Sequence, residues 1–230
     1  MRARLLLATA LAALGAGAAA GGLAAAPAPP RTVECAGLPT CIDVPGPWVA
    51  VPARGEASFL LECPQRRGVV GGVDSLASSR DVHVVFEGLL GGPVSPGRTT
   101  TRYAFFHAVS GRHRAGLFEP RIGCIPTGGG QRSTTSARAL TPAGAPLDLA
   151  ATLVPVEPDG SHLTLACAAG RLVDSWTAVS FAVPVPPSLA SAVRVHSTVV
   201  SGRLAVTINP SRTLPRSART RVQVGVACAR

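Results

Sequence analysis

Two stretches decide the fold: SFLLEC at residues 58–63 and HLTLAC at residues 162–167. In both, every second residue is apolar and the last of these is a cysteine, whereas the residues between them are mostly polar or small. Side chains alternate between the two faces of a β-strand, so this period of two predicts a half-buried strand that ends on an inward-facing cysteine. The two cysteines lie 104 positions apart (167 − 63).

A second cysteine follows each of these at the same distance, 61 positions in both cases (124 − 63 and 228 − 167). The residues before it, FEPRIGC at 118–124 and VQVGVAC at 222–228, again have one apolar face. Few residues are identical between the paired stretches. Matching spacing and matching inward faces nevertheless predict an internal repeat, with copies near residues 49–124 and 153–228.

Between these ends, short apolar segments bounded by Gly, Pro and Ser predict more strands. They cover residues 68–73, 82–86 and 102–109 in the first copy and residues 172–181, 193–200 and 204–208 in the second. Ser201-Gly202 is typical of a tight hairpin turn, and Gly71-Gly72 is expected to interrupt a strand. No segment after the N-terminus has helical periodicity. The sequence therefore predicts an all-β protein of two tandem, disulfide-bridged β-sandwich repeats.

The N-terminus has the pattern of a secretory signal peptide. Two arginines precede an apolar run at residues 5–14, and small residues continue to Ala26. We predict a signal peptide at residues 1–26 that is removed on export, which makes the protein secreted or associated with the cell envelope. The alternative is an uncleaved membrane anchor, because residues 5–26 are long enough to span a bilayer. The Ala and Gly content favours cleavage, after which no transmembrane helix is expected.

Composition divides the rest of the chain into four parts. The boundaries come from the cysteine spacing and from a stretch rich in Gly, Ser, Thr and Pro, which is typical of a linker. We predict an N-terminal segment at 27–47, a first repeat at 48–126, the linker at 127–146 and a second repeat at 147–230.

All six cysteines follow the signal peptide, and an even number in an exported protein indicates disulfides. The short Cys-x-x-Cys or Cys/His clusters of metal sites are absent, so neither a metal nor another cofactor is predicted. Six cysteines allow fifteen connectivities. Because inward-facing cysteines end the first and last strands of each copy, we expect the pairs Cys35–Cys41, Cys63–Cys124 and Cys167–Cys228. A link between the copies would instead mean that they interleave into one domain.

The spacing of 61 residues is similar to that of the immunoglobulin fold, in which one bridge joins two sheets. The sequence also departs from that fold. Trp176 follows Cys167 by only nine residues (176 − 167). Ile122 and Val226 stand where the tyrosine corner needs a tyrosine. The similarity therefore implies a sandwich of immunoglobulin-like architecture and not membership of the family.

Motifs that carry known chemistry are missing. The chain has no nucleophile elbow, zinc-binding helix or phosphate-binding glycine loop. Asp74-Ser75 and Asp174-Ser175 are interpreted as polar residues of turns or strand edges. With 9 aromatic residues (2 Trp, 1 Tyr and 6 Phe), no stacking surface for sequence-specific nucleic-acid binding is expected. We predict a non-enzymatic binding or structural module; the alternative is an envelope hydrolase whose catalytic residues the sequence does not identify.

One basic feature recurs before the last strand of each copy. All 22 basic residues are arginines, and after signal removal the net charge is +8 (20 − 12). The loops contain Arg112 and Arg114 in the first copy and Arg216, Arg219 and Arg221 in the second. We hypothesise that these arginines bind a polyanion, such as an anionic polymer of the envelope. The alternative is a pair of solvated loops in an arginine-rich chain.

Overall fold

The computed structural model describes residues 35–36, 41–64, 68–87, 102–111, 113–125 and 147–229. They lie within one compact unit, Arg31–Arg230. The signal peptide and the linker predicted above lie outside the described residues. Among the described residues, no helix is long and apolar enough to cross a membrane.

The described residues form strands and short 3-10 helices, which confirms the all-β prediction. The strands of the first half are β1 (Ile42–Pro45), β2 (Trp48–Val51), β3 (Glu56–Glu62), β4 (Val69–Ala77), β5 (Val82–Glu87), β6 (Tyr103–Ser110) and β7 (Gly116–Ile125). The second half comprises β8 (Leu147–Pro155), β9 (Ser161–Ala166), β10 (Arg171–Phe181), η2 (Pro187–Ser191), β11 (Val193–Val200), β12 (Arg203–Pro210), η3 (Arg216–Ala218) and β13 (Arg221–Ala229).

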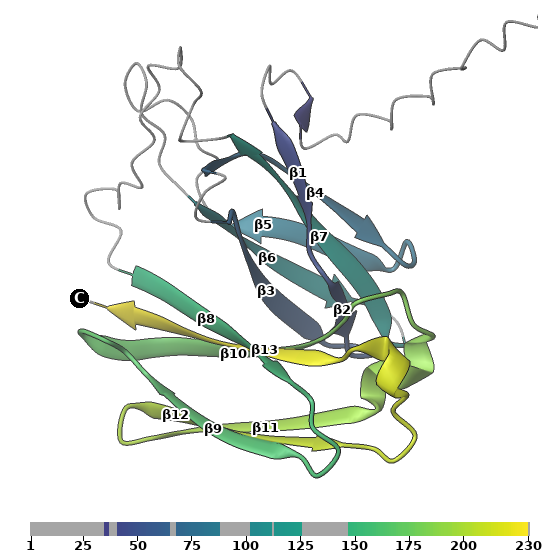
Figure 1. Ribbon diagram of the computed structural model, residues 1–230, viewed down its shortest axis with the longest axis vertical. Coiled ribbons are helices and arrows are strands. Elements are labelled where there is room, and N and C mark those ends of the chain that lie inside the picture. Colours follow the sequence, from purple (N-terminus) through teal and green to yellow (C-terminus); the bar gives the residue numbers. More distant parts are fainter. Residues whose placement is uncertain are drawn as a thin grey trace, which may run out of the picture. The chain divides into compact units, whose positions relative to one another are not determined.

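These strands form one large sheet and two small ones (Figure 1). The large sheet has the order β1-β7-β2-β10-β13-β8, with β4 also paired to β7. The first small sheet is β3-β6-β5 and the second is β11-β12-β9. The large sheet passes from one half of the chain to the other at β2 and β10, where Val49 pairs with Ser180 and Trp48 with Phe181.

Each half has its own apolar core between a small sheet and its part of the large sheet. Val49 belongs to the core of the first half, and Val179 packs against the core of the second. Paired residues of neighbouring strands share a face of the sheet, so Val49 shares a face with Ser180. Successive residues point to opposite faces, which puts Val179 on the other side. The two small sheets therefore cover opposite faces of the large sheet.

The two halves pair their strands in the same order. β4-β7-β1/β2 corresponds to β10-β13-β8, and β3-β6-β5 corresponds to β9-β12-β11. Each half also has a β-bulge at the same place, between Val70 and Gly72 in β4 and between Leu172 and Asp174 in β10. Here the prediction from Gly71-Gly72 was wrong, since β4 continues to Ala77. The glycines belong to a bulge, where one extra residue is accommodated without ending the strand.

The cysteines pair as the spacing predicts. Bridges join Cys35 to Cys41, Cys63 to Cys124 and Cys167 to Cys228, and no described cysteine is free. The Cα atoms of the two long-range bridges are 5.9 and 5.7 Å apart. Three disulfides fit an oxidising compartment. The predicted hairpin turn is confirmed as well: Val200 pairs with Arg203, and the turn residues between them have φ angles of 49° and 72°.

Candidate anion-binding site

A buried polar contact fixes the two halves against each other. Gln223 of β13 is 3% exposed. Its Oε1 accepts hydrogen bonds from the backbone N–H of Leu60 (2.7 Å) and from Nε1 of Trp176 (3.0 Å), and its Nε2 donates to the Leu60 carbonyl (2.8 Å). The Trp176 ring meets Phe105 edge-on, with centroids 4.8 Å apart. Each buried polar atom of the amide therefore has a partner from another strand, which is the condition for a stabilising buried network.

On the face of the large sheet opposite to Gln223, the loop between β12 and β13 packs against the start of β7. Ala218 of this loop belongs to an apolar cluster with Leu117, Ala50 and Phe181, and Leu214 packs against the same cluster. The loop between β6 and β7 leads into Gly116 and Leu117, the first two residues of β7. Both arginine loops predicted from the sequence therefore adjoin the junction between the halves.

A groove of about 700 Å³ opens between the β8–β9 and β12–β13 loops. It is lined by Pro155, Val156, Glu157, Pro158, Pro210, Ser211, Arg212, Leu214, Pro215, Arg216, Arg219 and Thr220. Three of these residues are arginines and only one is acidic, so the lining carries net positive charge. All three arginines are exposed, and none forms an ion pair with another described residue. Their guanidinium groups are available to an anion from solution.

Two local features of this groove are unusual. Arg219 has a left-handed backbone, with φ 43° and ψ 54°, where glycine is normally preferred because it has no Cβ to clash. Thr220, which is 8% exposed, has a buried hydroxyl oxygen without a hydrogen-bond partner among the described residues. Backbone strain and unpaired buried polar groups both cost free energy and both concentrate at functional sites.

The predicted arginines are only partly brought together. Arg216 and Arg219 line the groove, whereas Arg221 is the first residue of β13 and is exposed outside it. Arg114 is exposed in the β6–β7 loop, and Arg112 lies outside the described residues. The sequence reasoning missed Arg212. It lies in the same loop but before the arginine-rich stretch at residues 214–221 to which the prediction was restricted.

The first half adds a second basic loop. Arg54, in the turn between β2 and β3, also has a left-handed backbone, with φ 52°. Its guanidinium is hydrogen-bonded to Nε2 of His113 in the β6–β7 loop. The two loops are tied together further by the backbone N–H of Ser110, which donates to the Gly55 carbonyl (2.9 Å). Arg54, His113 and Arg114 are all exposed.

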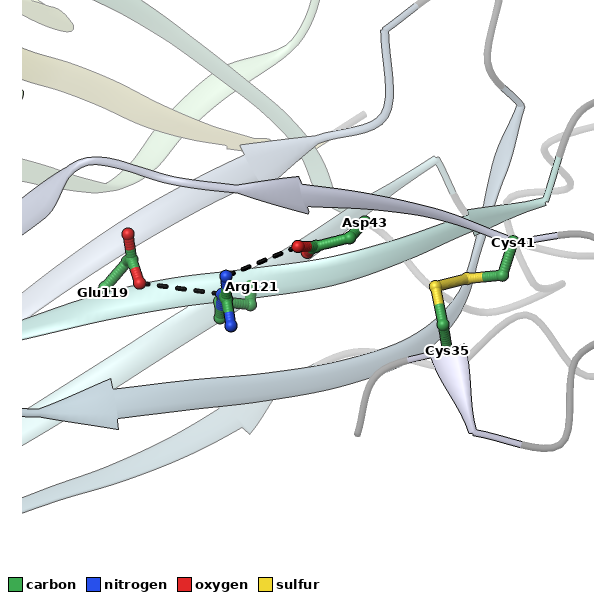
Figure 2. A network of polar contacts seen from close by, with 5 residues as sticks. All are labelled: Cys35, Cys41, Asp43, Glu119 and Arg121. Carbon is green, nitrogen blue, oxygen red and sulfur yellow. Dashed lines mark hydrogen bonds and ion pairs between the residues drawn. A yellow bond between two sulfur atoms is a disulfide. The ribbon is translucent and has the colours of Figure 1, made fainter. Parts of the chain in front are cut away.

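Arg121 is an example of an arginine that is paired with carboxylates inside this fold. Figure 2 shows its guanidinium between Asp43 and Glu119, close to the Cys35–Cys41 bridge. The ion pairs span 3.4 Å to Asp43 and 3.6 Å to Glu119. Only 20% of the Arg121 side chain is exposed. This arginine is engaged by carboxylates of its own sheet, in contrast to the three arginines of the groove.

A serine, a histidine and a glutamate meet on the outer face of the first small sheet. Ser58 Oγ and His107 Nδ1 are hydrogen-bonded at 3.0 Å, and His107 Nε2 lies 3.5 Å from Glu56 Oε2. This is the order of groups in a hydrolytic triad. However, the Glu56 side chain is 73% exposed, so the acid of this arrangement lies largely in solvent. An acid exposed in this way does not provide the water-excluded, preorganised environment in which such groups stabilise a transition state.

The same kind of contact recurs in the second half with the groups exchanged. There His162 of β9 bonds through Nδ1 to Thr207 Oγ1 of β12 at 2.9 Å, and no acid accompanies it among the described residues. A cross-strand histidine–hydroxyl pair is thus a feature of both small sheets. No group of three or more His, Cys, Asp or Glu side chains that could hold a metal ion occurs among the described residues.

No protein-family model, no curated protein and no solved structure matches the chain. The functional conclusion therefore depends on the residues of the site alone.

Proposed function

We propose that this protein is an exported, non-enzymatic module that binds an anionic polymer of the cell envelope or its surroundings. The module consists of two tandem β-sandwich repeats of immunoglobulin-like architecture, which follow a cleaved signal peptide. The equal pairing order, the equivalent bulges and the two bridges with a sequence separation of 61 support the repeat. The domain boundaries are those predicted from the sequence.

One observation carries the binding proposal: three exposed arginines, which have no acidic partner among the described residues, line a groove that contains a single carboxylate. Arginine presents a planar fork of donors that matches phosphate and carboxylate oxygens. The β6–β7 loop with Arg114 adjoins the same junction, which the Gln223 contacts hold in one geometry. A chain-like anion that reaches both loops gains avidity because the second contact is intramolecular.

Removing the groove arginines is expected to weaken polymer binding. We expect Arg212→Gln/Arg216→Gln/Arg219→Gln to lower the affinity for linear polyphosphate and for anionic envelope fractions about tenfold, since three exposed charge contacts together contribute about 1.4 kcal/mol. Adding Arg112→Gln/Arg114→Gln should lower it further. Fluorescence anisotropy at low and moderate salt measures both, and binding by the parent should fall with salt.

Two controls distinguish binding by the groove arginines from a general effect of the protein's net charge. Arg171→Gln/Arg194→Gln/Arg203→Gln removes the same charge from exposed positions outside the groove and should leave most of the affinity. Arg219→Gly removes one guanidinium at a residue whose backbone suits glycine, so it should weaken binding without lowering the stability of the fold. Equal losses in the groove and control variants would show that only net charge matters and would overturn the proposal.

A second candidate function, ester or glycoside hydrolysis, is favoured by one observation only, the Ser58–His107–Glu56 contact. Because the acid of the triad, Glu56, is largely exposed to solvent, we expect Ser58 not to react with a fluorophosphonate probe. We also expect any ester turnover to be equal in the parent and in Ser58→Ala. Labelling followed by peptide mass spectrometry decides this. Labelled Ser58, with turnover abolished in Ser58→Ala, would replace the binding proposal by the hydrolase.

A further inference from the structure

Two histidines flank a threonine in one cross-strand row of the second small sheet. His196 of β11 pairs with Thr207 of β12, and Thr207 pairs on its other side with His162 of β9. Their neighbours Val206 and Ile208 are buried in the core, so the row faces outward, and both histidines are exposed. From this row we infer that the protein has a surface binding site for a divalent transition-metal ion, held by His162 and His196.

The spacing of the row suits two imidazole ligands. Directly paired residues have Cα atoms roughly 4.5–5.5 Å apart, so the two histidine Cα atoms are about 10 Å apart across the sheet. Side chains that lean from the outer strands toward the middle one meet above it. The middle residue, Thr207, is small enough to leave that space open. Imidazole nitrogen binds such ions at about 2.0–2.1 Å.

The His162 ring is already held in a suitable position. Its Nδ1 is hydrogen-bonded to Thr207 Oγ1 at 2.9 Å, which draws the ring toward the middle strand and therefore toward His196. With Nδ1 as the donor, Nε2 carries the lone pair that a metal ion needs. Histidine ligands of metal sites commonly have their second nitrogen fixed by such an outer hydrogen bond.

The surroundings indicate which ions fit. The adjacent rows on this face contain no carboxylate; they consist of Arg194 and Asn209 on one side and of Thr198, Ala205 and Thr164 on the other. A donor set of imidazoles without carboxylates suits Cu²⁺, Ni²⁺ and Zn²⁺ and does not suit Ca²⁺ or Mg²⁺. Water completes the coordination of the ion, because the site lies on an open face.

The first half provides a matched control within the same molecule. It has the corresponding histidine–hydroxyl pair, Ser58 and His107, at 3.0 Å. The third position of its row, however, is Val85 in place of a histidine. The first half should therefore lack the transition-metal site.

The experiment is a titration of the full exported chain, purified without a histidine tag, with Cu²⁺, Ni²⁺, Zn²⁺ and Ca²⁺. We expect one Cu²⁺ site with two nitrogen ligands in the electron paramagnetic resonance spectrum, and no Ca²⁺ binding. His162→Ala and His196→Ala should each abolish this signal, and Thr207→Val should lower the affinity about tenfold by releasing the ring. His107→Ala should change nothing. Cu²⁺ binding that survives in His162→Ala/His196→Ala, or that is absent from the parent, would overturn the inference.

Discussion

Replacing Cys167 and Cys228 together by alanine is expected to lower the free energy of unfolding by about 4 kcal/mol. The bridge closes a loop with a sequence separation of 61 residues. Removing such a cross-link raises the conformational entropy of the unfolded chain and so stabilises the unfolded state by that amount of free energy. The lost stability affects the second half, whose core is partly open to solvent, since Cys167, Leu163 and Leu165 are only partly buried. Urea denaturation monitored by circular dichroism measures the change.

The small N-terminal bridge is the matched control. Cys35 and Cys41 are only six positions apart, so Cys35→Ala/Cys41→Ala should cost about half as much in the same loop-entropy account. An equal or larger loss in the small loop would contradict this explanation. The stability of the second half would then have to arise from its packing and not from the constraint on its chain.

Gly225→Ala is expected to destabilise the fold by about 3 kcal/mol, an overpacking effect at the upper end of the usual range. A Cβ at this position would lie 2.0 Å from Cε2 and Cζ2 of Trp176. The indole cannot move aside freely, because its Nε1 donates to Gln223 and its ring rests against Phe105. The substitution therefore strains the contact that joins the two halves. Tryptophan fluorescence during urea denaturation reports on this site.

Two further variants test the cause. At Gly111 a Cβ would meet nothing within 4 Å, so Gly111→Ala should stay within about 0.5 kcal/mol of the parent. In Gly225→Ala/Trp176→Leu the smaller side chain makes room, so the double variant should lose less than the two single losses together. If the stability losses of the two single variants were strictly additive, the loss in Gly225→Ala would have a cause other than a clash with the Trp176 indole.

Much of this fold follows from period-two patterns. The inward-facing positions around Cys63, Cys124, Cys167 and Cys228 identified the strands and their bridges, because burial and alternation act locally. The junction of the two halves could not be predicted in the same way. Val49 and Ser180 are paired although more than a hundred residues separate them in the sequence. Neither strand has a sequence pattern that identifies the other as its partner.

For the candidate sites too, local sequence features could be predicted and features that depend on distant segments could not. A run of arginines in a loop is visible in a sequence, so Arg216 and Arg219 were found, whereas the groove between two loops was not. The histidines at 162 and 196 appear scattered along the chain. They share a row only because β12 lies between β9 and β11 and sets their register. Metal-site reasoning from sequence relies on short spacings and has no means of detecting such a row.

The pairing of β2 with β10 also bears on the order in which the protein is completed. Val49 and Ser180 are 131 positions apart (180 − 49), a separation that makes their pairing slow because the entropic cost of closing a loop grows with its length. A polypeptide is made from its N-terminus, so β2 emerges before β10 and pairs with it only after that strand has been made. Its unpaired edge and the Trp48 side chain stay open to solvent and to other chains during that interval. The second edge of β2 is thus completed late, which places a risk of misassembly in the time before the second half arrives.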